Sequence, residues 1–204
     1  MPETKSQDAI ALLKKDHDDV KELFDQFEKT RDRAAKQEIV RQALAELKVH
    51  AVLEEELFYP AIRKHVGSDQ MNEADEEHHV AKVLIAELDL SGGSGDHREA
   101  KFTVLAESVR HHIKEEENEM LPKAKELDID FEALGQKMLD RKKELEENGI
   151  PKDREHAMVA RANGKDDTPA MAARKAAPAA RKTAGKTAAA HSRTHKSGST
   201  HASH

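Results

Sequence analysis

The chain contains no cysteine, which excludes a disulfide framework and any metal site built from thiolates. Aromatic residues make up only 3% of the 204 residues, with no tryptophan and one tyrosine, Tyr59. A core must therefore consist mainly of aliphatic side chains and methionine. This composition favours packed helices, because β-strands are enriched in aromatic and β-branched residues.

Long apolar runs and a secretion signal are also missing. No stretch approaches the roughly 18 apolar residues that predict a membrane span. The first ten residues, MPETKSQDAI, lack the basic and then apolar layout of a signal peptide. We therefore expect a cytoplasmic protein with no membrane partner.

Charge is distributed unevenly along the chain. Residues 157–204 contain nine Lys and Arg against two acidic residues, a net charge of +7. Residues 1–156 contain 25 against 38, a net charge of −13, and the two parts sum to −6. The basic end has too few apolar residues to offset the entropy lost on ordering. We predict a folded domain over residues 1–150 and a disordered basic tail over residues 151–204.

The acidic part has the periodicity of helices. Apolar residues recur every three or four positions in four segments, and no segment shows strand-like alternation. These segments span about residues 6–29, 34–65, 71–90 and 97–126. Because short connections join them, we predict an all-α protein, an up-down-up-down four-helix bundle. A short fifth helix is expected at about residues 130–148, with Asp130 as N-cap and Gly149 as its stop.

One motif occurs twice, 62 residues apart. His50 and His112 each begin a His-x3-Glu pattern, and each is followed ten residues later by a proline. In every predicted long helix the apolar face is interrupted near its middle by one histidine. These four histidines are His17, His50, His78 and His112. The i,i+4 spacing places Glu54 and Glu116 on the same faces as the histidines that precede them.

Buried charge explains why this pattern indicates metal. An unpaired carboxylate in an apolar core costs several kcal/mol or more. Protonation or mutual pairing of the side chains relieves part of that cost. Divalent or trivalent cations relieve it more completely, since imidazole and carboxylate suit iron, manganese or zinc.

The intervals between the histidines indicate two similar halves. His17 and His50 are 33 residues apart, and His78 and His112 are 34 apart. Each interval allows one helix to run out, turn and return to the same level. Residues 10–60 and 71–122 are thus predicted to be two copies of one helical hairpin, related by a pseudo-twofold axis and enclosing two metals.

The combined pattern resembles the hemerythrin-like, or HHE cation-binding, domain over about residues 8–125. Its elements are Asp-His at 16–17, His50-x3-Glu54, Glu-His at 77–78 and His112-x3-Glu116. The resemblance implies a non-haem di-iron centre with an oxo or hydroxo bridge. The histidines would bind iron, Glu54 and Glu116 would bridge two Fe ions, and an open position would take O2, peroxide (H2O2) or nitric oxide (NO).

Two departures from the oxygen-carrying hemerythrins bear on activity. Those proteins have His-x3-His on the third helix, whereas Lys82 follows His78 here, and they have His-x4-Asp on the fourth. A carboxylate-rich site with one imidazole fewer favours redox reaction, sensing or iron handling over reversible O2 carriage. Peroxide disproportionation is compatible with this site but is not required by any residue. An additional ligand from His79, His111 or Tyr59 is left open.

The other polar residues near the motifs have alternative interpretations. His79 and His111 are expected on the surface or behind the ligands, and the remaining glutamates, including Glu55 and Glu117, on a solvated face. Asp16 and Glu77 either hydrogen-bond ligands or simply belong to the helix surface.

The basic tail has two interpretations as well. It either binds nucleic acid without sequence preference, because it has no aromatics for base stacking, or it is an extension without a specific role. The alternative function is therefore an iron storage or sensing protein tethered to nucleic acid.

Overall fold

The computed structural model describes residues 8–91 and 96–163, and every regular element within these two ranges is helical. The elements are α1 (Ala9–Lys29), α2 (Arg33–Leu53), the π-helical turn η1 (Glu54–Phe58), α3 (Tyr59–Ile62), α4 (Ser68–Leu90), α5 (Asp96–Glu115), the π-helical turn η2 (Glu116–Met120), α6 (Leu121–Lys125), α7 (Phe131–Asn148) and α8 (Arg154–Ala162). Two long rods result, because α2 continues through η1 into α3, and α5 continues through η2 into α6.

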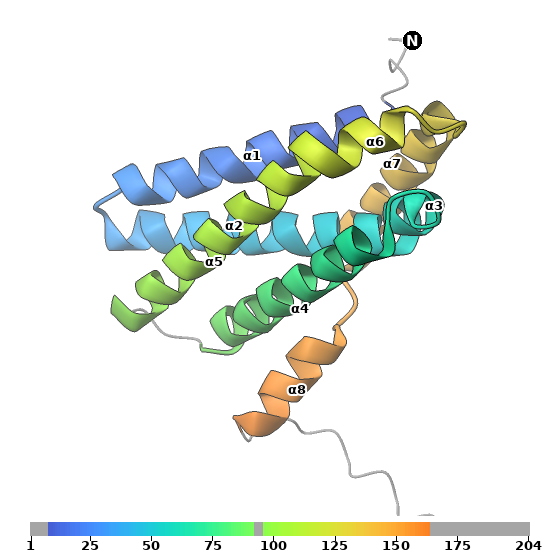
Figure 1. Cartoon of the computed structure of the whole chain (residues 1–204). Coiled ribbons are helices and arrows are strands. Elements are labelled where there is room, and N and C mark those ends of the chain that lie inside the picture. Colours follow the sequence, from blue (N-terminus) through green and yellow to red (C-terminus); the bar gives the residue numbers. More distant parts are fainter. Residues whose placement is uncertain (1–7, 92–95, 164–204) are drawn as a thin grey trace, which may run out of the picture. The chain divides into compact units, whose positions relative to one another are not determined.

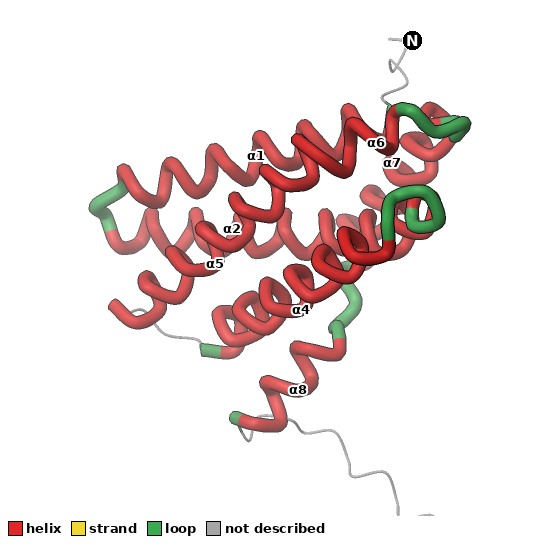
Figure 2. The backbone as a smooth tube through the Cα atoms, in the orientation of Figure 1, coloured by secondary structure: helices red, strands yellow, loops and turns green. Residues whose placement is uncertain are grey.

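The long helices form the predicted up-down-up-down bundle (Figure 1). α1 packs against α2, and α4 packs against α5, so each half is a helical hairpin. Contacts of α1 with α5 and of α2 with α4 join the halves. α7 packs on α1, α2 and η1 at the end of the bundle where α3 and α6 finish (Figure 2). The all-α fold class is thus confirmed.

Helix ends follow from local side-chain chemistry. Asp8, Asp32, Asp130 and Asp153 each accept a hydrogen bond from the backbone N–H three residues later, at the start of α1, α2, α7 and α8. Gly149 ends α7 with φ of 86°, a conformation that favours glycine. The predicted roles of Asp130 and Gly149 are therefore confirmed.

The apolar core is divided into two clusters. One surrounds Leu13, Leu53, Phe58 and Met120 near α7, and the other surrounds Phe24 and residues of α2, α4 and α5. Phe102 packs on Phe24 and on Phe27 in this second cluster. The residues predicted to bind metal occupy the level between the two clusters, since His17 lies one helical turn from both Leu13 and Val20.

Helix α8 was not expected from the sequence. The predicted tail began at residue 151, yet α8 packs against α4 and belongs to the same compact unit as the bundle. It buries few apolar side chains, Val159 and Ala160, and a carboxylate, Glu155. The helix has only 9 residues, so its apolar pattern is too short to distinguish it from the tail in the sequence. The rest of the predicted tail, residues 164–204, lies outside the described residues.

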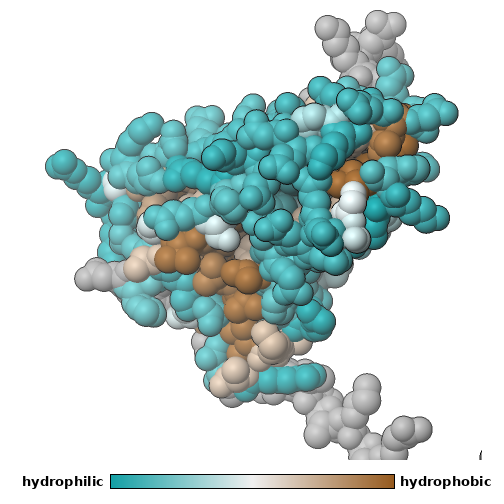
Figure 3. Space-filling view, in the orientation of Figure 1, coloured by the Kyte–Doolittle hydropathy of each residue, from teal (hydrophilic) through white to brown (hydrophobic). Residues whose placement is uncertain are grey.

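The surface carries few large apolar side chains. Figure 3 shows a mostly hydrophilic face with a smaller apolar area below the middle of the view. Val80, Val104 and Met158 are the exposed large apolar residues within the described ranges. In this part of the chain, no helix combines the length and apolar character needed to cross a bilayer.

Candidate metal centre

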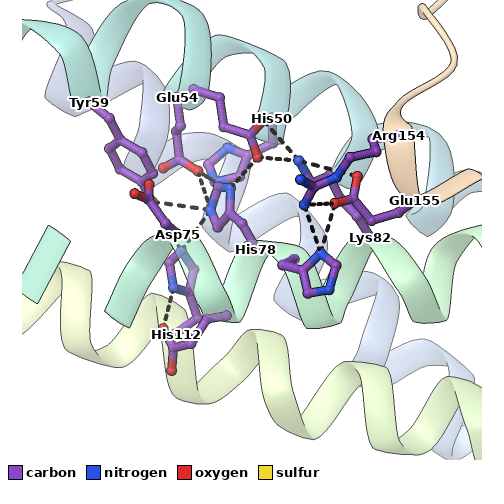
Figure 4. Close-up of polar contacts among 12 residues, drawn as sticks. His50, Glu54, Tyr59, Asp75, His78, Lys82, His112, Arg154 and Glu155 are labelled. Carbon is purple, nitrogen blue, oxygen red and sulfur yellow. Dashed lines mark hydrogen bonds and ion pairs between the residues drawn. The ribbon is translucent and has the colours of Figure 1, made fainter. Parts of the chain in front are cut away.

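Six polar side chains converge at the level between the two apolar clusters. Each is less than 8% exposed, although all six can carry charge. They are His17, His50, Glu54, His78, His112 and Glu116, the same residues that the sequence pattern singled out. In Figure 4, His50, His78 and His112 lie close to one another beside Glu54.

Each glutamate lies between one histidine of each half. Oε2 of Glu54 is 3.1 Å from Nε2 of His50 and 3.3 Å from Nε2 of His78. Oε2 of Glu116 is 3.2 Å from Nε2 of His17 and 3.6 Å from Nε2 of His112. The pseudo-twofold relation expected from the spacing is thus present at the level of single atoms.

The same atoms fall into two groups that could each hold a cation. The first group is His17, His50, Glu54 and Glu116, and the second is Glu54, His78 and His112. Glu54 belongs to both groups, which is the position of a bridging carboxylate. Two adjacent cation positions therefore fit these side chains.

Several of the inward-facing atoms lack any hydrogen-bond partner. They include Nε2 of His17, Nε2 of His50, both carboxylate oxygens of Glu54 and Oε2 of Glu116. Buried polar groups are hydrogen-bonded in the great majority of cases, because an unpaired one costs about 1–3 kcal/mol and a charged one costs more. A metal pair would satisfy these atoms, so the donor set fits it.

Four further carboxylates, here called the outer carboxylates, face the other ring nitrogens of the histidines. His17 Nδ1 donates to Glu117 at 3.1 Å, His78 Nδ1 donates to Glu55 at 3.0 Å, and His112 Nδ1 donates to Glu77 at 2.7 Å. Asp16 lies 3.9 Å from Nδ1 of His50, which is too long for a direct hydrogen bond. A hydrogen bond at Nδ1 fixes the ring so that Nε2 points inward, as in most metal-binding histidines.

The outer carboxylates follow a regular pattern. Asp16 and Glu77 directly precede the lone histidines in the sequence. Each faces the histidine of the His-x3-Glu motif in its own half, His50 or His112. Glu55 and Glu117 directly follow the buried glutamates in the sequence. Each contacts the lone histidine of the other half, His78 or His17. Glu55 is exposed as expected and Glu117 is partly buried, but the sequence did not predict that both contact ligand histidines of the neighbouring helices.

The π-helical turns begin at the two buried glutamates. In η1 the Tyr59 N–H donates to the carbonyl of Glu54, and in η2 the Leu121 N–H donates to that of Glu116. One residue after each turn comes a proline, Pro60 or Pro122, that has no N–H and crowds the carbonyl four residues earlier. The wider turn accommodates this crowding, and π-turns are frequent at functional sites. The rods neither end nor break at the prolines.

Tyr59 enters the centre because of the π-turn. Its ring is 1% exposed, and its hydroxyl donates to Oε1 of Glu116 at 2.8 Å. The hydroxyl oxygen of Tyr59 is also 3.1 Å from Nε2 of His78 and 3.3 Å from Nε2 of His112. An α-helix would turn Tyr59 away from Glu54, so regular helical periodicity could not have found this contact.

The charged groups of the centre shift one another's pKa values. Burial opposes protonation of His50, but the Glu54 carboxylate outweighs it and raises the pKa of His50 to about 10. Burial likewise opposes protonation of His78, but the neighbouring carboxylates of Glu54 and Glu55 raise its pKa to about 9. Burial tends to raise the pKa of Glu54, yet His50 and His78 hold it well below its usual range. Without a cation, protons on these histidines balance the carboxylate.

The neighbours of the ligand histidines have separate roles. His79 Nδ1 donates to Glu155 of α8 at 2.7 Å, and Arg154 also donates to Glu155 at 3.1 Å. Lys82 reaches Glu55 at 2.8 Å, and its ammonium is 3.8 Å from Glu155 (Figure 4). His111 is 63% exposed, in agreement with a surface position, and lies 3.1 Å from Glu115. Neither His79 nor His111 faces the six buried residues.

A small cavity adjoins the centre within the bundle. Its volume is about 40 Å³ and its walls include His17, His50, His78 and His112. Val20, Leu47, Ile85, Val109 and Ile113 make the rest of the lining predominantly apolar. A water molecule occupies about 30 Å³ in the liquid, so the space suits one small molecule.

Comparison with known proteins gives one family and one related fold. Residues 8–124 match the family model described as the hemerythrin HHE cation binding domain. A solved hemerythrin HHE cation binding domain-containing protein from Mycobacterium kansasii aligns with a TM-score of 0.59 and 22% identity. That alignment covers 78% of this chain and 94% of the other, and at this identity it supports the fold alone.

This chain also matches part of a longer curated protein. A protein named DNA nickase, from Nostoc sp., is 28% identical over 107 residues. The match covers 52% of this chain and only 30% of that protein.

Proposed function

Since this chain belongs to the hemerythrin HHE cation-binding family, we propose that it is a non-haem di-iron protein whose iron pair binds or reacts with O2, peroxide or nitric oxide. The observation that carries the proposal is the set of buried nitrogen and oxygen atoms without hydrogen-bond partners at the two cation positions. His17 and His50 would hold one iron, His78 and His112 the other, with Glu54 and Glu116 between them.

The donor set is compatible with iron and disfavours metals that require thiolate or all-oxygen ligands. It contains imidazole nitrogen and carboxylate oxygen but no sulfur, a combination that suits iron, manganese and zinc. The fourfold imidazole content disfavours magnesium and calcium, which prefer oxygen ligands. When bound, an iron pair supplies exchange between ferrous and ferric states.

The chain's own residues restrict what reaches the metals. The apolar cavity of about 40 Å³ admits a molecule of two or three heavy atoms. Lys82 lines this cavity at the position where the oxygen carriers have a further histidine, and its ammonium is held by Glu55. The side of the pair near Lys82 therefore has fewer protein ligands, which leaves room for an external one.

Metal analysis with spectroscopy tests the proposal. Protein loaded anaerobically with Fe2+ and then oxidised is expected to contain about two irons per chain and to absorb in the near ultraviolet as an oxo-bridged ferric pair. Glu54→Ala should lose most of the iron, whereas the exposed-site control His97→Ala should retain it. Zinc bound alone in a 1:1 ratio in the purified protein, with no iron uptake, would contradict the proposal.

Reactivity is tested on the same samples. Oxygen evolution on addition of peroxide, present in the loaded protein and absent from Glu54→Ala, would support an enzyme. A stable spectral change with nitric oxide or O2 but no turnover would instead support a sensor or binding protein.

The second candidate is an iron storage or sensing protein tethered to nucleic acid. The net charge of +7 over residues 157–204 supports it, because binding to phosphates requires a surplus of Lys and Arg. A gel shift with duplex DNA that disappears at raised salt and after deletion of residues 164–204 would support this role. No shift at low salt would exclude it.

A further inference from the structure

One outer carboxylate differs from the other three in how its charge is balanced. Asp16 is paired with Lys142 at 2.7 Å, Glu55 with Lys82 at 2.8 Å, and Glu117 with Lys21 at 3.3 Å. Glu77 has no ion pair with any lysine or arginine of the described residues, although its Oε2 is 2.7 Å from Nδ1 of His112.

In place of a lysine, Glu77 has an exposed histidine, His111, and a second glutamate, Glu115, as neighbours. Oε1 of Glu77 is 3.9 Å from Nε2 of His111, and that nitrogen is 3.1 Å from Oε1 of Glu115. One donor atom from each of the three residues lies within 4.8 Å of the others. An imidazole nitrogen and two carboxylate oxygens at this spacing are a ligand set for a divalent cation.

The two glutamates of this cluster, Glu77 and Glu115, also line a groove that reaches the buried centre. Its volume is about 180 Å³, and Glu73, Glu77, Glu115 and Glu119 line it. The only basic residue of its lining is Lys123, which donates to Gln70 at 2.8 Å. No described lysine or arginine forms an ion pair with any of the four glutamates, so the groove is strongly negative.

The inner wall of the groove is part of the centre itself. His112 and Glu116 both line it. Glu116 is 1% exposed, and its Oε2 has no hydrogen-bond partner. A buried acceptor without a partner thus stands at the end of an acidic groove that opens to solvent, which indicates a path for cations and not merely a solvated acidic face.

We propose that Glu77, His111 and Glu115 form a surface site for a divalent cation, from which metal passes along the groove to the buried pair. This inference rests on the proposed di-iron function, because the buried pair is the destination. The negative groove concentrates cations at its mouth, and such focusing raises association rates by about 10- to 1,000-fold. The surface site holds the metal more weakly than the centre, since it is exposed and offers fewer ligands.

The test uses the full chain, freed of metal by a chelator, and Co2+ as the probe. Uptake is followed by the visible absorption of Co2+ in a His/Glu environment after rapid mixing. The double variant His111→Gln/Glu115→Gln removes the surface site but leaves Glu77, which positions His112. The matched control is His97→Gln/Glu107→Gln, which changes two exposed residues of the same helix, α5.

The double variant should load at least about fivefold more slowly than the wild type and the control, and reach the same final Co2+ content at the buried residues. Loading of the wild type should slow with added salt more steeply than that of the double variant. Mn2+ electron paramagnetic resonance should detect a weak additional Mn2+ in the wild type and the control but not in the double variant.

Equal loading rates for the double variant and the wild type, with no additional Mn2+ lost, would overturn the surface site alone. Failure of the wild type to take up Co2+ at the buried residues, judged by identical spectra for wild type and Glu54→Ala, would overturn the di-iron proposal and this inference together.

Discussion

The hydroxyl of Tyr59 donates a 2.8 Å hydrogen bond to Oε1 of Glu116, across the centre from the other half of the chain. The two halves are otherwise nearly equivalent here, since Glu54 and Glu116 occupy matching positions in η1 and η2. Sixty-two residues after Tyr59 the chain has Leu121, which is buried and has no polar side-chain atom. Glu54 therefore receives no hydroxyl, and its oxygens have no hydrogen-bond partner.

Replacing Tyr59 with Phe should destabilise the metal-free protein by about 1–3 kcal/mol, because Oε1 of Glu116 loses its donor in a buried place. The ring remains packed, so the fold should be kept. Urea unfolding of the metal-free protein measures the loss. Val104→Ala, at an exposed position of α5, is the control for a neutral change. An unchanged midpoint in Tyr59→Phe would show that another group satisfies Glu116.

Replacing Glu55 with Gln should weaken iron binding by about 10- to 100-fold, because a charged partner of a ligand histidine is removed. The matched control is its neighbour, Glu56→Gln, which pairs with Arg141 on the surface and does not face the centre. Competition with a chelator of known affinity measures both variants. Equal affinities for the two would contradict the role of Glu55 in holding His78.

Iron binding should strengthen as pH rises through the neutral range. The pKa values of His50 and His78 are raised to about 10 and 9, so both rings carry protons below these values in the metal-free protein. Metal must displace these protons, since protonated imidazole cannot coordinate. Affinity should therefore rise by up to about a hundredfold per pH unit between roughly pH 7 and 9. Calorimetry in buffers of different ionisation enthalpy counts the released protons, and none released would refute the prediction.

Docking of α8 should weaken in acid. Burial opposes ionisation of Glu155, but the hydrogen bond from His79 and the charge of Lys82 outweigh it and lower its pKa to about 2. A lowered pKa stabilises the folded state above the ordinary value near 4.5, and this contribution is lost as pH falls from there towards 2. Amide hydrogen exchange in α8 should accelerate over that range.

Glu155→Gln separates this effect from the titration of other carboxylates. In that variant α8 should already exchange faster at neutral pH and respond less to acid. The control is Glu147→Gln, which removes an exposed ion pair with Lys143 and should behave as wild type. Identical exchange in all three proteins would show that α8 is held by its apolar contacts alone.

The sequence was sufficient to predict the bundle and the convergence of six side chains. A histidine on every apolar face, spaced so that each hairpin returns to the same level, permits few other arrangements. The ends of α7 were predictable as well, because Asp130 and Gly149 act through their nearest neighbours in the chain.

Three features were outside the reach of helical periodicity. Tyr59 faces the centre only because the chain widens at η1, and a single Pro60 does not specify whether a helix bends, ends or widens. Glu55 and Glu56 are indistinguishable in the string EEE until the neighbouring helix is in place. α8 contacts α4 partly through Glu155 and His79, and polar contacts between distant segments leave no periodic signal.

The crossed contacts of Glu55 and Glu117 have a consequence for how the molecule assembles. Each hairpin supplies the carboxylate that orients a histidine of its counterpart, so neither hairpin can complete a binding site alone. Capturing metal and joining the hairpins are thus thermodynamically linked. A chain severed between residues 91 and 96 should reassociate more tightly when iron is supplied, and a chelator should weaken the association again.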